Sequence, residues 1–211
     1  MSVPHLLTRT SHRTRGHDGI AFLGELSLAK ARVHEFCGTA RRTLALSVAR
    51  AMQGQIFWIR PGWAVEHLNG AALPPWIDPG RVITLSPRRP EDLLWTMEEA
   101  LRAGVVPLVV GDISGPPGLT AVRRLHLAAE TGAAEGDVAP VGILLTATGE
   151  GAPGVETRWR LTPNHGANGH SAWRLDRLRA RTLPPATWQV AKTGNGTLTL
   201  SKATAAESVV S

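Results

Sequence analysis

The sequence predicts an α/β domain, RecA-like in arrangement, built on a mostly parallel sheet with flanking helices and antiparallel C-terminal strands. Apolar runs of strand length recur along the chain, and segments of helical period lie between them. Parallel strands buried on both faces need such uninterrupted runs, and strands separated by helices imply right-handed crossovers. After Gly149 short alternating segments replace the runs, which predicts antiparallel strands at one edge of the sheet.

Five apolar runs are the expected strands of the parallel core: 33–36, 55–59, 81–85, 105–110 and 141–145. Helices are expected over 43–54, 91–102 and 119–131. The second helix has the clearest boundaries. Glu91 opens it, Arg102 closes it and Gly104 follows, which suits the helix dipole and a left-handed residue after the last turn.

The C-terminal part is expected to hold four short strands, over 157–161, 171–175, 187–191 and 197–201. A hairpin turn is predicted at 193–196, because its Asn-Gly pair tolerates positive φ. The predicted organisation is a basic, flexible N-terminal arm over 1–21, one domain over 22–201, and a flexible tail over 202–211.

Composition favours a cytoplasmic protein with polyanionic partners. The 211 residues are 43% hydrophobic and 19% charged, and no apolar run approaches the roughly 18–20 residues that span a bilayer. The first 18 residues hold no apolar core of a secretory signal, so no membrane partner is expected. A single cysteine, Cys37, excludes an intramolecular disulfide. The net charge of +6 favours polyanions such as nucleic acid.

A broken phosphate-binding loop is predicted where the first core strand meets its helix. The strand 33–36 leads into Gly38. Arg42 and Thr43 stand where a Walker A motif, G-x-x-x-x-G-K-[ST], would place its lysine and hydroxyl residue. The loop is two residues shorter than that consensus, and Arg41 replaces the glycine before the lysine. Because a phosphate cradle needs a long turn of backbone N–H groups, we expect efficient nucleotide binding to be lost.

The residues alone leave two interpretations of this loop open. Either Arg42 retains some anion binding, since guanidinium pairs well with phosphate, or the loop is only a strand–helix connector, which we favour. Asp112 likewise has two interpretations. Either it stands at a Walker B-like position, where a carboxylate would bind Mg²⁺, or it caps the loop that follows it. Without the lysine and the glycine-rich cradle we expect no cofactor, and in particular no ATP.

Other acid–base side chains offer weaker sites. His165 and His170 have no third ligand nearby, so no metal site is expected and a surface loop is favoured. Glu98 and Glu99 lie well inside a predicted helix. Glu98 has Arg102 four residues later, which places the pair on a solvated helix face and argues against catalysis.

Arginines and tryptophans alternate through the C-terminal part. An extended chain would put Arg177, Arg179 and Arg181 on one face, whereas a helix would group Arg174 with Arg177 and Arg181. Three interpretations of the arginines stay open: they contact nucleic acid, they contact an acidic protein surface, or they are merely solvated. The tryptophans either stack on bases or point into the core, and we favour the core. The candidate contacts are Arg158, Arg160, Arg174, Arg177, Arg179 and Arg181.

The parallel core, the Walker-type loop and the antiparallel extension together resemble the RecA-like fold, and the chain is similar to the ImuA family of RecA-related proteins. The similarity covers roughly residues 22–201. It is carried by 32–35 leading into Gly38, by 94–104, which resembles a Trp-x-x-Glu-Glu-Ala-Leu stretch, and by the tryptophan-containing segments 157–161, 173–175 and Trp188.

The resemblance implies a non-catalytic adaptor in SOS-induced, error-prone translesion DNA synthesis. The implied partners are an ImuB-type relative of Y-family polymerases and a DnaE-type polymerase, with nucleoid association during DNA damage in a bacterial cytoplasm. Single-stranded DNA is a further candidate partner, on the charge of the C-terminal arginines. The alternative is a SulA-like inhibitor of the tubulin-like division protein, which also lacks a usable phosphate loop. A divergent ATPase that uses Arg42 for the missing lysine is the third interpretation.

Overall fold

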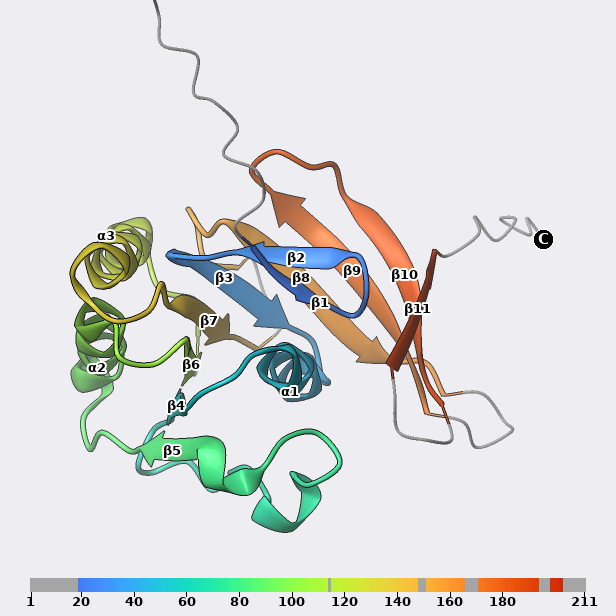
Figure 1. Cartoon of the computed structure of the whole chain (residues 1–211), viewed down its shortest axis with the longest axis horizontal. Coiled ribbons are helices and arrows are strands. Elements are labelled where there is room, and N and C mark those ends of the chain that lie inside the picture. The colour runs from blue at the N-terminus through green and yellow to red at the C-terminus, as the bar shows by residue number, and fades with distance from the viewer. Residues whose placement is uncertain (1–18, 114, 148–150, 166–170, 194–197, 203–211) are drawn as a thin grey trace, which may run out of the picture.

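The computed structural model describes residues 19–113, 115–147, 151–165, 171–193 and 198–202. These residues form a nine-stranded mixed sheet with helices on both faces, and a separate two-stranded sheet (Figure 1). The large sheet has the strand order β11-β10-β9-β8-β3-β7-β6-β4-β5. The predicted α/β class with a mostly parallel core is therefore confirmed.

The strands of the described chain are β1 (Gly19–Phe22), β2 (Leu26–Ala29), β3 (Arg32–Cys37), β4 (Ile56–Ile59), β5 (Val82–Leu85), β6 (Leu108–Asp112), β7 (Val141–Leu145), β8 (Thr157–Pro163), β9 (Ala172–Ala180), β10 (Ala186–Lys192) and β11 (Leu198–Lys202). The helices are α1 (Arg41–Ala51), α2 (Pro90–Ala103) and α3 (Leu119–Glu135), with short 3-10 turns η1 (Gly70–Ala72) and η2 (Pro79–Arg81). All five expected core strands and all three expected helices are present.

The sheet is parallel through six neighbouring strands. β3 pairs with β7 on one side and with β8 on the other, both parallel, and β6, β4 and β5 continue the parallel core. β9, β10 and β11 then follow in antiparallel pairs. The segment 157–161 was expected among the antiparallel strands. It instead pairs with β3 in parallel, and the change to antiparallel pairing comes between β8 and β9.

A short antiparallel hairpin precedes the core, and sequence reasoning did not anticipate it. β1 pairs with β2, with Gly19 opposite Ala29 and Phe22 opposite Leu26. Residues 19–21, expected at the end of the N-terminal arm, therefore belong to a strand. Residues 1–18 and 203–211, and most of the expected 193–196 turn, lie outside the described residues. The antiparallel pairing of β10 with β11 around that turn is as expected.

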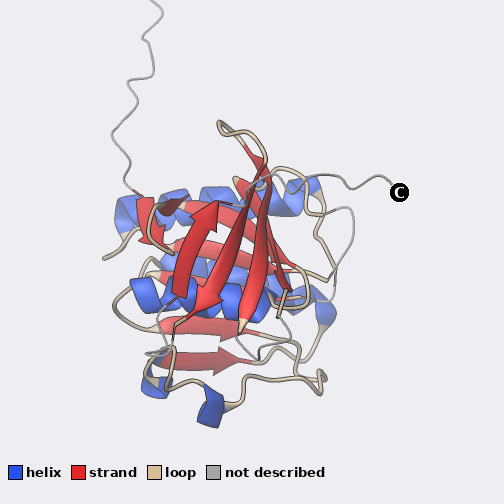
Figure 2. Cartoon of the chain, turned by 90° about the vertical axis from the view of Figure 1, so that its right-hand side faces the viewer, coloured by secondary structure: helices blue, strands red, loops and turns tan. Residues whose placement is uncertain are grey.

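The helices cover the two faces of the sheet unequally. α2 and α3 pack side by side on one face over the parallel core, while α1 and the β1–β2 hairpin cover the other (Figures 1 and 2). Gly104 has a left-handed φ of +58° directly after α2, as expected for a residue that ends a helix. Two apolar cores result, one on each face of the sheet.

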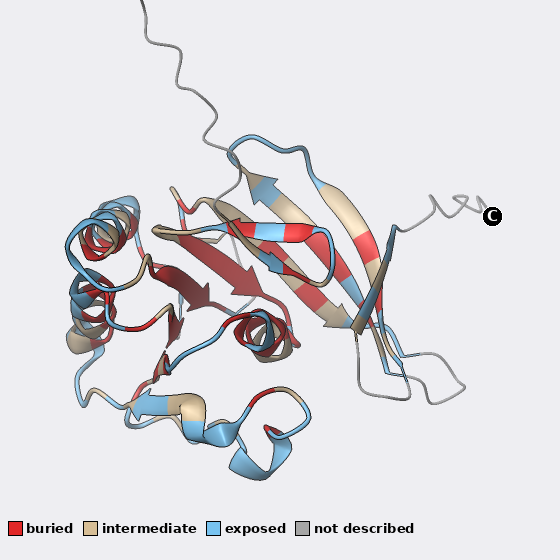
Figure 3. Ribbon diagram, viewed as in Figure 1, coloured by how far each residue is buried: buried red, intermediate tan, exposed pale blue. Residues whose placement is uncertain are grey.

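The core strands and the extension show different burial patterns. β6 and β7 are buried at every residue, whereas inward and outward residues alternate along β8 and β10 (Figure 3). The inward residues include Trp159, Trp173 and Trp188, all buried in the core beside α1 and the hairpin. The expectation that these tryptophans point into the core is confirmed.

Candidate functional site

The loop after β3 is held by its neighbouring strand. Gly38 has φ of +90°, and a Cβ built there would lie 2.4 Å from the carbonyl oxygen of Leu161 in β8. The N–H of Ala40 donates to that same oxygen at 3.1 Å, and the N–H of Arg41 donates to the Gly38 carbonyl at 3.3 Å. The close approach of β8 therefore explains the glycine, and two backbone N–H groups of the short loop already have partners.

Arg42 of α1 connects the end of β6 to the loop after β4. Its Nε donates to Oδ2 of Asp112 at 2.7 Å, and its Nη1 donates to Oε2 of Glu66 at 2.8 Å. Burial opposes the charge of Arg42, but the bonds to Asp112 and Glu66 outweigh that effect and raise its pKa. Arg42, predicted at the lysine position, thus contacts Asp112, predicted at a Walker B-like position, directly.

The hollow beside this ion-pair network is small. It has a volume of about 200 Å³ and is lined by Arg41, Arg42, Arg60, Pro61, Ala64, Val65, Glu66, Asp112 and Ile113. Small-molecule pockets usually measure roughly 300–1,000 Å³. Thr43 lies in the first turn of α1, half-buried and outside the lining. Three predicted residues therefore meet at this hollow, in a geometry that suits a connector better than a nucleotide site.

Arg60 belongs to the same region and was not predicted. Its Nη1 donates to the carbonyl oxygens of Ala64 at 2.8 Å and Glu66 at 3.2 Å. These bonds connect the end of β4 to the loop that carries Glu66, and Trp63 in the same loop is 49% exposed. The contacts are local to the loop, but the Arg-Pro-Gly sequence alone gives no indication that Arg60 turns back onto it.

The five candidate arginines of β8 and β9 separate onto the two faces of the sheet. Arg160 lies opposite Asp176, and Arg158 opposite Arg179, so these side chains share one face. Arg177 lies opposite Trp159 on the other face, because a bulge shifts the register by one residue between these two pairs. The extended-chain expectation that Arg177 and Arg179 share a face is therefore wrong.

Arg177 is part of the tryptophan cluster. Its guanidinium carbon lies 5.6 Å from the ring centroid of Trp159 and 5.2 Å from that of Trp188, and its Nε donates to the Pro184 carbonyl at 3.1 Å. Burial against the rings lowers the pKa of this guanidinium. The cation thus closes the edge of the apolar core by cation–π contact, on the face opposite the other arginines.

The Arg158 side chain also points into the protein interior. It forms an ion pair with the fully buried Glu35, with Nε 3.3 Å from Oε2. Glu35 also accepts hydrogen bonds from the Thr146 hydroxyl at 2.6 Å and from the Ala152 N–H at 2.9 Å. The pair ties β3 and β8 to the segment after β7, which is a structural role.

Two of the remaining arginines, Arg160 and Arg174, share one buried acid. Oδ2 of Asp176 accepts from Nε and Nη2 of Arg160 at 3.2 and 3.0 Å. Its Oδ1 accepts from Nε of Arg174 at 2.9 Å and from the Thr187 hydroxyl at 2.8 Å. Burial alone would raise the pKa of Asp176, but the three donors outweigh it and hold the pKa below its usual value. Beyond β9, Arg181 is largely exposed, with Nε 3.7 Å from Glu156.

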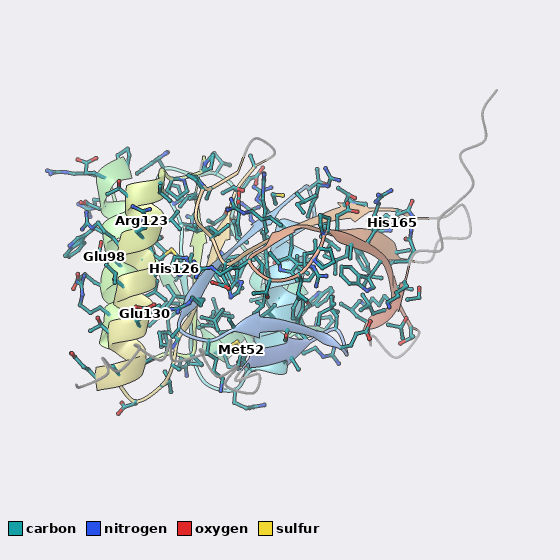
Figure 4. All side chains as sticks on the ribbon, turned by 90° about the horizontal axis from the view of Figure 1, so that it is seen from above. Met52, Glu98, Arg123, His126, Glu130 and His165 are labelled. Carbon is teal, nitrogen blue, oxygen red and sulfur yellow. The ribbon has the colours of Figure 1, made fainter. Side chains whose placement is uncertain are left out.

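Glu98 is more deeply placed than expected. Its carboxylate accepts from Arg102 at 2.5 Å, as predicted, but also pairs with Arg124 of α3 at 2.7 Å. Glu98 is buried between the helices, so the prediction of a solvated face is wrong for this residue. Arg102 also pairs with Glu99. Figure 4 shows Glu98 on α2, beside α3.

His165 lies far from Glu98, at the other end of the molecule (Figure 4). Its Nδ1 accepts from the N–H of Ala172 at 3.0 Å, and its ring meets Trp173 edge-on. His170 lies outside the described residues. Within the described part of the chain, no group of three or more His, Cys, Asp or Glu side chains is arranged to hold a metal ion.

Comparison with known proteins yields no match to a family model or to a curated protein. In the described segments, no helix is both long and apolar enough to cross a membrane.

Proposed function

We propose that this chain is a non-catalytic, RecA-like accessory protein of SOS-induced, error-prone translesion synthesis, similar to ImuA. In this role it is an adaptor between an ImuB-type relative of Y-family polymerases, a DnaE-type polymerase and DNA. One observation carries the proposal. The ion pairs from Arg42 to Asp112 and Glu66 occupy the region where a RecA-type ATPase would hold phosphate and Mg²⁺. An adaptor needs the fold but no ATP cycle.

The topology supports the RecA-like part of the proposal. The degenerate loop follows the first strand of the parallel core, and antiparallel strands extend the sheet beyond β8. Asp112 ends β6, which is separated from β3 by β7 alone, so the two Walker-like positions lie at the same edge of the sheet. Ligands of open α/β sheets bind at the carboxyl ends of the strands. Here the ion pairs of Arg42 with Asp112 and Glu66 occupy that end.

The Trp-x-x-Glu-Glu-Ala-Leu stretch supports the adaptor part. On α2 its later residues Glu98, Ala100 and Leu101 are buried, whereas Trp95 is 57% exposed. Trp95 borders a groove of about 260 Å³ between α2 and α3, lined also by Glu91, Leu94, Glu98, Ala121, Arg124 and Leu125. Tryptophan is among the side chains that dominate binding energy at protein interfaces. We place the contact with the polymerase relative at this groove.

Co-purification with the ImuB-type protein tests the proposal. We expect association at micromolar concentration, weakened at least about tenfold by Trp95→Ala, since loss of an interface tryptophan often costs about 2 kcal/mol or more. Leu127→Ala is the matched control, because Leu127 is an exposed apolar residue on α3 outside the groove lining.

Three results would redirect the proposal. No association of the wild-type proteins would remove the adaptor role. Association that is insensitive to both substitutions would retain the adaptor but move the interface away from the groove. Filamentation of cells on overexpression without DNA damage would instead support a SulA-like division inhibitor.

A further inference from the structure

The face of β8 to β11 that carries Arg160 and Arg174 is an open polar surface. α2 and α3 cover this face of the sheet over the parallel core, but they lie on the side of the molecule away from β9, β10 and β11 (Figure 1). The strand register places hydroxyl and amide side chains beside the arginines on the same face: Thr162, Thr187, Gln189, Thr199 and Ser201.

We propose that Arg160 and Arg174, held together by Asp176, form a binding site for the phosphodiester backbone of single-stranded nucleic acid. The inference deepens the proposed function, since it rests on the expected contact of an adaptor with DNA. It also excludes two of the candidate arginines from the binding site. Arg158 is paired with Glu35, and Arg177 packs on the tryptophans of the opposite face.

Asp176 is the positioning residue of this site. Its side chain is only 6% exposed, whereas those of Arg160 and Arg174 are 42% and 54% exposed. Each guanidinium carries five N–H donors, and the bonds to Asp176 use only the inner ones. The carboxylate therefore anchors one side of both guanidinium groups and leaves outer donors directed to solvent. Because the two arginine side chains are already restricted, they lose less conformational entropy when an anion binds, which favours affinity.

The surface chemistry favours a phosphate backbone over stacked bases. The three tryptophans of these strands, Trp159, Trp173 and Trp188, are buried on the opposite face. Backbone phosphates accept hydrogen bonds from arginine, serine, threonine and glutamine side chains, and all four types are present on this face. Arg179 shares the face and Arg181 follows the strand, so both extend the positive surface past the site. Binding should be independent of sequence and strongly dependent on salt.

Fluorescence anisotropy with a labelled oligothymidylate tests the site. Four contacts, from Arg160, Arg174, Arg179 and Arg181, predict a log–log salt slope of about −3 on a single strand, equivalent to about 50-fold weaker binding at 200 mM than at 50 mM salt. Arg160→Gln with Arg174→Gln should reduce that loss to about sevenfold. Arg88→Gln with Arg89→Gln removes the same charge from the exposed segment before α2, and should leave the slope near that of the wild type.

Asp176→Asn separates positioning from charge. The substitution makes the surface more positive, so an effect of net charge alone would strengthen binding, whereas loss of the anchor should weaken it severalfold at every salt concentration. Thermal unfolding confirms that each variant is folded. Should Asp176→Asn fold poorly, Thr187→Val removes one donor to the same carboxylate and should weaken binding in the same direction.

Three outcomes would overturn the proposal. These are no binding of oligothymidylate by the wild type, equal slopes for the two double-arginine variants, or tighter binding by Asp176→Asn. The first would leave an acidic protein surface as the partner of this face. The proposed adaptor is tested separately by co-purification with the ImuB-type protein in the absence of DNA, so either idea can fail without the other.

Discussion

Protonation of His34 should destabilise the protein as the pH falls from about 6.5 to about 4. The imidazole is fully buried in β3. Its Nε2 lies 3.0 Å from the Ala29 carbonyl and therefore donates to it, and its Nδ1 accepts from the Thr157 hydroxyl at 2.6 Å. That hydroxyl oxygen accepts in turn from Nε1 of Trp159 at 2.7 Å. The chain of bonds joins β2, β3 and β8 through a neutral histidine.

The size of the effect follows from the pKa of His34 in the two states. Burial lowers its pKa from 6.5 to about 4, although the bond to Ala29 opposes the shift. Above pH 6.5 the histidine is neutral in both states, so its protonation costs nothing. Between the two values only the unfolded state takes up the proton, and each pH unit lowers the free energy of unfolding by about 1.4 kcal/mol. The total loss is about 3 kcal/mol, complete below about pH 4.

Urea unfolding between about pH 7 and pH 4 measures this loss. The free energy of unfolding of His34→Gln is subtracted from that of the wild type at each pH. This difference removes the contribution of the carboxylates, which both proteins share. The difference should change by about 3 kcal/mol over the window. His67→Gln, the same substitution at an exposed residue, is the control. A change below about 1 kcal/mol for His34→Gln would refute the reasoning, because it would mean that the native protein binds the proton readily.

Three further predictions concern the loop, the tryptophan cluster and catalysis. Gly38→Ala should cost at least about 2 kcal/mol in urea unfolding, from the positive φ and the clash with Leu161, whereas Gly70→Ala, with open space around it, should be nearly neutral. Arg177→Gln should lose about 1–2 kcal/mol, which lowers Tm by about 3–6 °C, while the salt slope of DNA binding stays unchanged. Phosphate release from Mg-ATP with single-stranded DNA should stay far below about 1 per second; faster turnover abolished by Arg42→Ala would contradict a non-catalytic protein.

Local patterns in the sequence determined the elements of this protein. Strand and helix positions, the glycine after α2 and the inward tryptophans of β8 to β10 all follow from the period of apolar residues and from helix-end signals. These features depend on the surroundings of one element at a time, and so they can be predicted from neighbours in the chain. The predicted departures from a Walker A pattern at Arg41 and Arg42 belong to the same class, because a motif is a local pattern.

Only the tertiary structure decided which residues meet. Arg42 pairs with Asp112 across 70 positions of sequence, and Glu98 is buried because Arg124 of another helix reaches it. One bulge beside β8 places Arg177 and Arg179 on opposite faces of the sheet, although they are two residues apart. Strand pairing and register are set by contacts between distant segments, and a shift of one residue exchanges the buried and exposed sides. For that reason the sequence identified a group of arginines, whereas the fold determined which of them solvent can reach.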